Sequence, residues 1–107
     1  MPIFQTGAYQ VKSSGVEKVK QAIAEFVKYV QQHETGSEMY LAWQQQDDPT
    51  KFIHLFIFKD QAAQQRHGES DAVRRFEAAY TPELAGGEVV FTDYTMIAGK
   101  RDAGGGR

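Results

Sequence analysis

Phe52-Ile53-His54-Leu55-Phe56-Ile57-Phe58 is the stretch of sequence that decides the fold, because it is apolar on both of the faces that a strand presents. Successive side chains of a β-strand point to opposite sides. The three phenylalanines and His54 therefore share one face, and the leucine and the two isoleucines share the other. We predict a strand over residues 52–58 that must be covered on both faces.

Two regular patterns precede this stretch. Residues 3–12 read as a first strand, with Tyr9 opposite in orientation to Gln10. The segment 14–17, Ser-Gly-Val-Glu, has the spacing of a capping box and predicts the start of a helix, which Gly36 would end. The helix carries one apolar stripe at steps of three and four. The stripe consists of Val16, Val19, Ile23, Phe26, Val27 and Val30. A second strand follows over residues 38–46, and residues 47–50, Asp-Asp-Pro-Thr, are typical of a turn.

The chain after residue 58 predicts two helical segments and a last strand. Asp60 is a suitable N-cap for a short helix that runs through His67, and Ser70 is suitable for a second helix that ends at Thr81-Pro82. Gly86-Gly87 predicts a turn, and residues 88–98 predict the last strand. The order β-α-β-β-α-β is that of the α+β ferredoxin-like fold, with one four-stranded antiparallel sheet.

Composition narrows the class of protein. The chain has 107 residues, of which 41% are hydrophobic and 24% charged, so we expect one globular domain over residues 1–99 and a flexible tail over 100–107. Cysteine is absent, which excludes a disulfide framework and a thiolate metal site. The net charge of -2 does not indicate a nucleic-acid-binding protein, because such proteins usually carry a basic surface. No apolar run reaches the length of a membrane span. We expect a cytoplasmic protein.

The predicted topology leaves one sheet face without a cover. Right-handed crossovers place both helical layers on the same side of the sheet. The strands at 38–46, 52–58 and 88–98 carry large apolar side chains on both sides. At about 25 cal/mol per Å², leaving several of them in water would forgo several kcal/mol. We therefore expect a homodimer that packs sheet against sheet. The alternative is a different protein that covers the same face.

Several segments together resemble the antibiotic biosynthesis monooxygenase (ABM) family. Residues 34–40, Glu-Thr-Gly-Ser-Glu-Met-Tyr, are similar to its helix-to-strand corner, and residues 47–52 are similar to the turn that follows. Residues 58–63, Phe-Lys-Asp-Gln-Ala-Ala, followed by His67, Ser70 and Phe76, resemble its helical segment. Residues 91–94 resemble its last strand. The resemblance spans about residues 3–98.

The resemblance implies a dimeric α+β barrel with a pocket between the helices and the sheet of each subunit. Characterised members include oxygenases that convert phenols or quinols without metal or flavin, whereas others degrade haem and many have no assigned reaction. The implied function is a cofactor-independent monooxygenase that acts on a small aromatic molecule and dioxygen. The alternative is a non-catalytic protein of the same fold that binds a small ligand or serves as an accessory subunit.

His67 is the candidate catalytic base, because it matches the family histidine and a histidine can accept a proton near neutral pH. A histidine that caps the helix end is the structural alternative. His54 is a candidate for the pocket or for the dimer interface, and a hydrogen-bonded core histidine is the alternative. Aromatic side chains are candidate substrate contacts, although the same residues are equally suited to a core or an interface. These are Tyr9, Tyr40, Trp43, Phe76 and Tyr94.

The sequence departs from two branches of the family. Ala72 stands where some quinol-oxidising members carry a second histidine, and residues 70–80 lack the histidine that ligates iron in the haem-degrading branch. Haem degradation through that ligand set is therefore disfavoured. No two of the three histidines have the i, i+4 spacing of a helical metal site, so we expect no metal.

Overall fold

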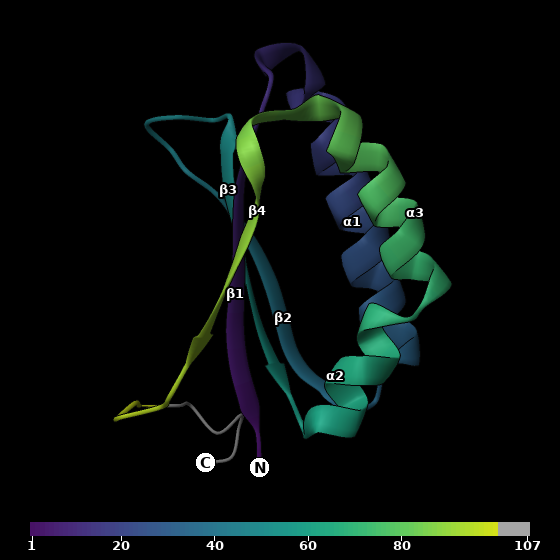
Figure 1. Ribbon diagram of the computed structural model, residues 1–107, viewed down its shortest axis with the longest axis vertical. Coiled ribbons are helices and arrows are strands. Elements are labelled where there is room, and N and C mark those ends of the chain that lie inside the picture. The colour runs from purple at the N-terminus through teal and green to yellow at the C-terminus, as the bar shows by residue number, and fades with distance from the viewer. Residues whose placement is uncertain (101–107) are drawn as a thin grey trace.

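Four strands form one antiparallel sheet in the order β2-β3-β1-β4, and the helices lie together against one face of it (Figure 1). The computed structural model describes residues 1–100. Its elements are β1 (Ile3–Val11), η1 (Ser13–Gly15), α1 (Val16–His33), β2 (Ser37–Gln44), β3 (Lys51–Phe58), α2 (Gln61–Gly68), α3 (Asp71–Tyr80), η2 (Thr81–Glu83) and β4 (Leu84–Tyr94). The predicted α+β ferredoxin-like fold is confirmed.

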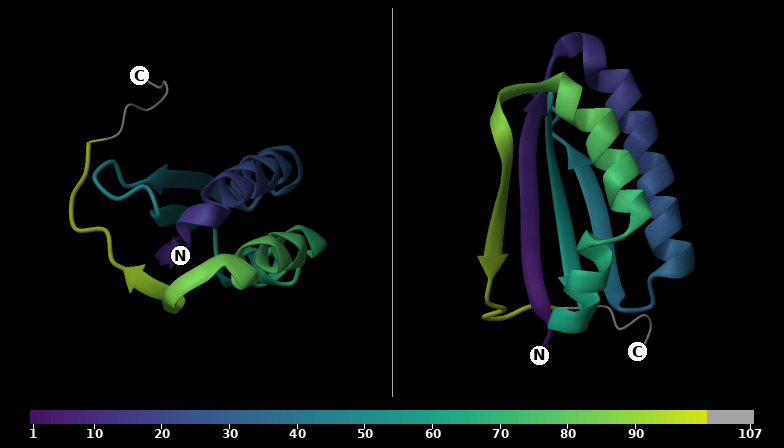
Figure 2. Two further views of the ribbon diagram at one scale, coloured as in Figure 1. Left: turned by 90° about the horizontal axis from the view of Figure 1, so that it is seen from above. Right: turned by 45° about the vertical axis from the view of Figure 1, so that its right-hand side comes forward.

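The core lies between the sheet and the two long helices, α1 and α3, which run side by side (Figure 2). Tyr9 of β1 and Phe52 of β3 face one another in the register and stack with ring centroids 5.6 Å apart. On the helical side, Phe26 of α1 stacks on Phe76 of α3 at 4.9 Å. These contacts join both helices to the two central strands, and they place aromatic rings around the space where the site is found.

The short helices begin where the sequence predicts. The Asp60 side chain accepts a hydrogen bond from the backbone N–H of Ala63 at 2.9 Å, and Ser70 accepts one from Val73 at 3.2 Å. Each cap satisfies an amide that has no partner within the helix. Because α2 starts at a fixed point after β3, His67 near its C-terminal end is held over the sheet.

The predicted capping box at the start of α1 does not form. Ser13–Gly15 adopts a 3-10 turn instead, and no side chain among residues 1–100 caps the helix. The Gly15 N–H donates a hydrogen bond to the Lys12 carbonyl at 2.9 Å. A backbone hydrogen bond therefore closes the turn that leads into α1. Glu83 of η2 packs against Gly15, where a Cβ would collide with it. The long-range contact with Glu83 thus overrides the local serine-glutamate pattern.

The last strand also differs from its prediction. β4 begins at Leu84 rather than residue 88, and Gly86 and Gly87, with φ of 80° and 113°, form a bulge inside the strand rather than a turn before it. The register with β1 shifts at this point. The strand ends at Tyr94 rather than residue 98. Tyr94 pairs with Phe4, and Pro2 near the start of β1 has no N–H to extend the ladder.

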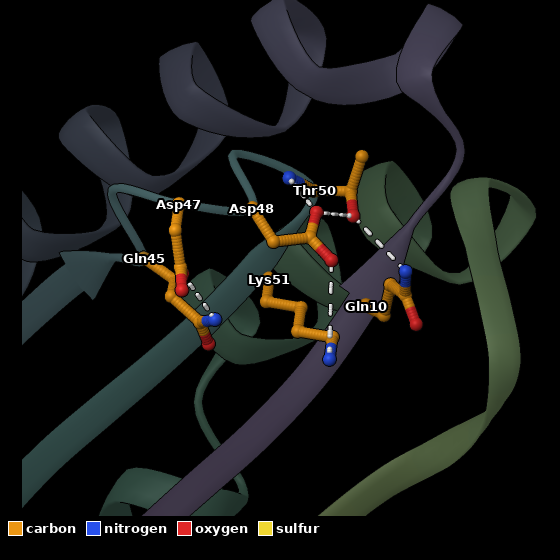
Figure 3. A network of polar contacts seen from close by, with 6 residues as sticks. All are labelled: Gln10, Gln45, Asp47, Asp48, Thr50 and Lys51. Carbon is orange, nitrogen blue, oxygen red and sulfur yellow. Dashed lines mark hydrogen bonds and ion pairs between the residues drawn. The ribbon is translucent and has the colours of Figure 1, made fainter.

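Residues 47–50 form the predicted turn between β2 and β3, held by the polar network of Figure 3. The Asp48 carboxylate accepts hydrogen bonds from the Thr50 hydroxyl at 2.5 Å and the Thr50 N–H at 3.2 Å, and these bonds lower the pKa of Asp48. Gln10 of β1 donates to the same hydroxyl at 3.0 Å. Asp48 therefore has a structural role, because it holds Thr50 in the turn while Thr50 bonds to the neighbouring strand β1.

The sheet face opposite the helices carries exposed apolar side chains. Trp43 is 56% exposed, Val90 61% and Tyr94 56%, and Leu41 is 41% exposed. Alternation along the strands places all four on this face. We call these four residues the outer face.

The sequence predicts a flexible C-terminal tail and no membrane-spanning segment. Residues 101–107 of the predicted tail lie outside the described residues. Among residues 1–100, no helix has both the length and the apolar character that crossing a lipid bilayer requires.

Candidate functional site

A cavity of about 320 Å³ lies between the sheet and the helices α2 and α3. Its walls are mainly aromatic, and its polar side chains are those of two histidines, three tyrosines, two glutamines and Glu77. This size is at the lower end of the range typical of small-molecule sites. The cavity is therefore suited to a small, flat and largely apolar ligand.

Five of the seven residues that the sequence singles out line this cavity. They are His67, His54, Tyr9, Tyr40 and Phe76. His54, Tyr9 and Tyr40 come from the three neighbouring strands β3, β1 and β2, while His67 and Phe76 come from α2 and α3. The antiparallel register brings the strand residues together, since Gly7 and Ala42 flank His54 on either side.

Trp43 and Tyr94 are not brought to the cavity. Both belong to the outer face, on the opposite side of the sheet from the helices. Trp43 is three residues from Tyr40 on the same strand, and side chains an odd number of positions apart point to opposite faces. The structure thus separates these two residues from the other five, and we leave them out of the site.

His54 is the centre of a buried hydrogen-bonded array. Its Nε2 lies 2.8 Å from the Tyr9 hydroxyl and its Nδ1 lies 3.0 Å from the Tyr40 hydroxyl, so both ring nitrogens have a partner. The residue is only 3% exposed. We call Tyr9, His54 and Tyr40 the Tyr-His-Tyr array.

Burial keeps the whole array uncharged. Burial lowers the pKa of His54 to about 4, because a positive charge in this apolar surrounding would lose its hydration. Burial also raises the pKa of Tyr9 and Tyr40 above their ordinary range, with smaller contributions from Tyr80 to both. At neutral pH the array therefore consists of a neutral imidazole and two neutral phenols.

The proton count of a neutral array has a consequence for ligand binding. A neutral imidazole has one N–H and one bare nitrogen. One tyrosine must donate its O–H to the bare nitrogen, and the other must accept the N–H. The tyrosine that accepts the N–H still has its own hydroxyl proton, and this proton has no acceptor within the array. The array can therefore give one hydrogen bond to an oxygen atom of a ligand in the cavity.

His67 belongs to a second polar group, which joins α2 to the corner between α1 and β2. Its Nδ1 lies 2.7 Å from Oε1 of Glu34, and the Ser37 hydroxyl donates to the same oxygen at 2.8 Å. The histidine partner is thus a carboxylate rather than a helix-end carbonyl. The other ring nitrogen of His67, Nε2, makes no hydrogen bond to any of residues 1–100.

Aromatic rings surround His67 and connect it to the array. The imidazole lies 5.0 Å from the ring of Phe58 and 5.5 Å from that of Phe26, measured between centroids. Tyr40 contacts both histidines, since its ring lies 5.6 Å from His67 while its hydroxyl bonds His54. The two polar groups therefore face one apolar cavity from adjacent positions.

Three residues of the site were not predicted from the sequence. Glu34 belongs to the corner that resembles the family, and its partner His67 is 33 residues away. Tyr80 lines the cavity and stacks on Tyr9 at 5.4 Å, which its spacing of four from Phe76 could have indicated. Phe56 lines the cavity beside His54, as the alternation of β3 implies.

The described residues offer no group of three His, Asp or Glu side chains arranged to hold a metal ion. His54 has both ring nitrogens occupied, and Nδ1 of His67 is occupied by Glu34. The Nε2 atom of His67 is the ring nitrogen of the site that is available to a ligand.

The chain matches one family model of known proteins over most of its length. A family model described as antibiotic biosynthesis monooxygenase (ABM) matches residues 2–79. The chain belongs to this family. The matched region includes every residue of the two polar groups, and it stops before β4. None of the curated proteins matches the chain with statistical support.

Solved structures share this ABM fold. A protein of Bacteroides thetaiotaomicron assigned to the antibiotic biosynthesis monooxygenases has a TM-score of 0.84 at 14% identity, with 91% of this chain and 90% of that chain covered. A protein of Nitrosomonas europaea with the same assignment has a TM-score of 0.82 at 18% identity, with 90% of each chain covered. At these identities the similarity shows the fold alone, so the chemistry rests on the site.

Proposed function

We propose that this ABM protein is a monooxygenase that oxidises a small phenol- or quinol-like aromatic molecule in the cavity, with dioxygen as the second substrate. The observation that supports this proposal is a base candidate at an apolar aromatic cavity. Nε2 of His67 has no hydrogen-bond partner among residues 1–100, and His67 lines the cavity together with Tyr9 and Tyr40. The family assignment supports the monooxygenase class.

The arrangement suits a reaction in which the substrate itself reduces dioxygen. His67 would take a proton from the substrate, which leaves an electron-rich aromatic anion. The spare hydroxyl proton of the Tyr-His-Tyr array would hydrogen bond to the anionic oxygen. For a substrate with a CH2 group between aromatic rings, dioxygen then supplies one atom to the new carbonyl group. The second oxygen atom leaves as water together with the two hydrogens of the CH2 group.

An oxygen-uptake assay tests this proposal. The purified protein is incubated with one-ring hydroquinones and with anthrone, and dioxygen consumption is followed against a protein-free control that measures autoxidation. We expect uptake above that control, with one atom from isotopically labelled dioxygen in the anthraquinone product. A protein that shifts its melting temperature with these compounds but forms no product above the control would be a binding protein instead. A Soret band on haem titration would favour haem chemistry.

The homodimer expected from the sequence remains part of the proposal. The outer face carries Leu41 and Trp43 on β2 and Val90 and Tyr94 on β4, the two edge strands of the sheet. A second copy of the chain with its own outer face would cover all four residues symmetrically. This arrangement removes apolar area from water without altering the cavity, which lies on the other side of the sheet.

Introducing a charge at the outer face is expected to break the dimer. In sedimentation at micromolar concentration, the native chain should run at twice its 12.0 kDa, and the Trp43→Glu variant should run as a monomer. Gln21→Glu introduces the same charge on the exposed side of α1 and should leave the dimer intact. A folded native chain that sediments as a monomer throughout this concentration range would contradict the proposal.

A further inference from the structure

His67 lies in the wall between two cavities of different character. One is the aromatic cavity described above. The other is a cleft of about 200 Å³ between the end of α1, the start of β2 and α2, with Glu34, Ser37 and Arg66 among the residues that border it. Within residues 1–100, His67 is the residue that borders both. The imidazole therefore connects an apolar space with a polar one.

Glu34 occupies the polar side of this wall in an unusual state. Its side chain is 14% exposed, and Oε1 contacts both His67 and Ser37. Its Oε2 is buried and has no hydrogen-bond partner among the described residues. A buried carboxylate oxygen without a partner is destabilising. Because this carboxylate costs stability, its contribution to folding does not explain its position. Its contact with His67 gives a better explanation.

The backbone around Glu34 is packed closely enough to hold this geometry. Gly36 is buried against α2, and a Cβ at this position would lie 2.5 Å from the Cβ of Ala63. The Lys59 N–H also bonds to the Gly36 carbonyl at 2.8 Å. The corner between α1 and β2 is therefore fixed to the segment that carries His67, which sets the position of the carboxylate relative to the ring.

We propose that Glu34 is a positioning residue that holds His67 as the Nδ1–H tautomer, with Nε2 unprotonated and available to the aromatic cavity. A carboxylate can only accept a hydrogen bond, so the nitrogen facing it must carry the proton. When the substrate O–H bond breaks and an Nε2–H bond forms, the Nδ1 proton stays on the ring. The negative charge of Glu34 then stabilises the imidazolium. The catalytic role of this tautomer rests on the proposed monooxygenase function.

The tautomer can be measured without any substrate. Long-range ¹H–¹⁵N correlation spectra distinguish a protonated from an unprotonated ring nitrogen, and His67 is assigned by comparison with His67→Ala. At an alkaline pH at which the ring is neutral, we expect native His67 to carry its proton on Nδ1. An Nε2–H tautomer in the native protein would overturn the proposal, whether or not the protein is an oxygenase.

Glu34→Gln tests the cause of the tautomer. Glutamine has nearly the same shape but can present an N–H to Nδ1, so the population of the Nε2–H tautomer should rise. Glu38→Gln removes the same charge at an exposed position four residues away and should leave the spectrum unchanged. If Glu34→Gln lowers the melting temperature and leaves the tautomer as in the native protein, Glu34 is structural and the proposal fails.

The kinetic expectation separates positioning from binding. In the oxygen-uptake assay, Glu34→Gln should lower kcat roughly 10²-fold and leave KM within about twofold, because the base is in the wrong tautomer while the cavity is intact. An unchanged kcat would also overturn the proposal. A protein with no oxygenase activity would fail the functional proposal alone, since the spectra still decide the tautomer.

Discussion

Replacing His67 with alanine is expected to lower kcat/KM for oxygen-dependent turnover by about 10²- to 10⁴-fold, the usual contribution of a positioned general base. The cavity would keep the Tyr-His-Tyr array and most of its aromatic wall, so the substrate should still bind. The deprotonation that makes the substrate electron-rich would then depend on water. Oxygen uptake and product formation at saturating and limiting substrate concentrations measure the two kinetic constants separately.

Two controls make this result specific to the missing base. His33→Ala removes an exposed histidine at the end of α1 and should retain native turnover. Added imidazole should restore part of the activity of His67→Ala, because the deleted ring leaves space beside the cavity. Native turnover by the alanine variant would exclude His67 as the base, and activity lost together with the folded state would be seen by circular dichroism.

Stability is expected to fall steeply as the pH is lowered below about 6.5, because of His54. Its pKa is about 4 in the folded protein and about 6.5 in the unfolded chain. Between these values the unfolded chain binds a proton that the folded protein excludes, so the free energy of unfolding decreases as the pH falls. The loss from this residue is about 2 kcal/mol between pH 7 and pH 5 and about 3 kcal/mol by pH 4. Below pH 4 the loss levels off, because His54 then takes up a proton in the folded protein as well.

Urea unfolding at a fixed protein concentration measures this effect. The fixed concentration matters because assembly would add to the apparent stability. His54→Gln keeps a hydrogen-bonding side chain but cannot titrate, so its free energy of unfolding should change less between pH 7 and pH 5. The difference in slope between the two proteins isolates His54 from carboxylates that titrate in both. Equal slopes would show that His54 is not held neutral by burial.

Local patterns account for most of the fold. Asp60 and Ser70 cap amides three residues ahead, and the alternation of β3 requires only neighbouring residues, so each was predictable from a short window. The capping box and the glycine turn failed for the opposite reason. Glu83 packs against the start of α1, and the partner strand β1 accommodates Gly86 and Gly87 as a bulge; both contacts come from distant parts of the chain.

The sequence by itself determined the element order, the aromatic face of β3 and the histidines worth testing, because those features depend on periodicity and on residue type. Tertiary structure alone decided which face of the sheet meets the helices. Both faces are apolar, so the alternation of side chains does not indicate which of them packs against the helices. That choice placed Tyr40 at the cavity and Trp43 on the outer face. It also joined Tyr9 to His54 across 45 positions and Glu34 to His67 across 33. Hydrogen bonds at such separations depend on strand register and helix packing, which no short segment contains.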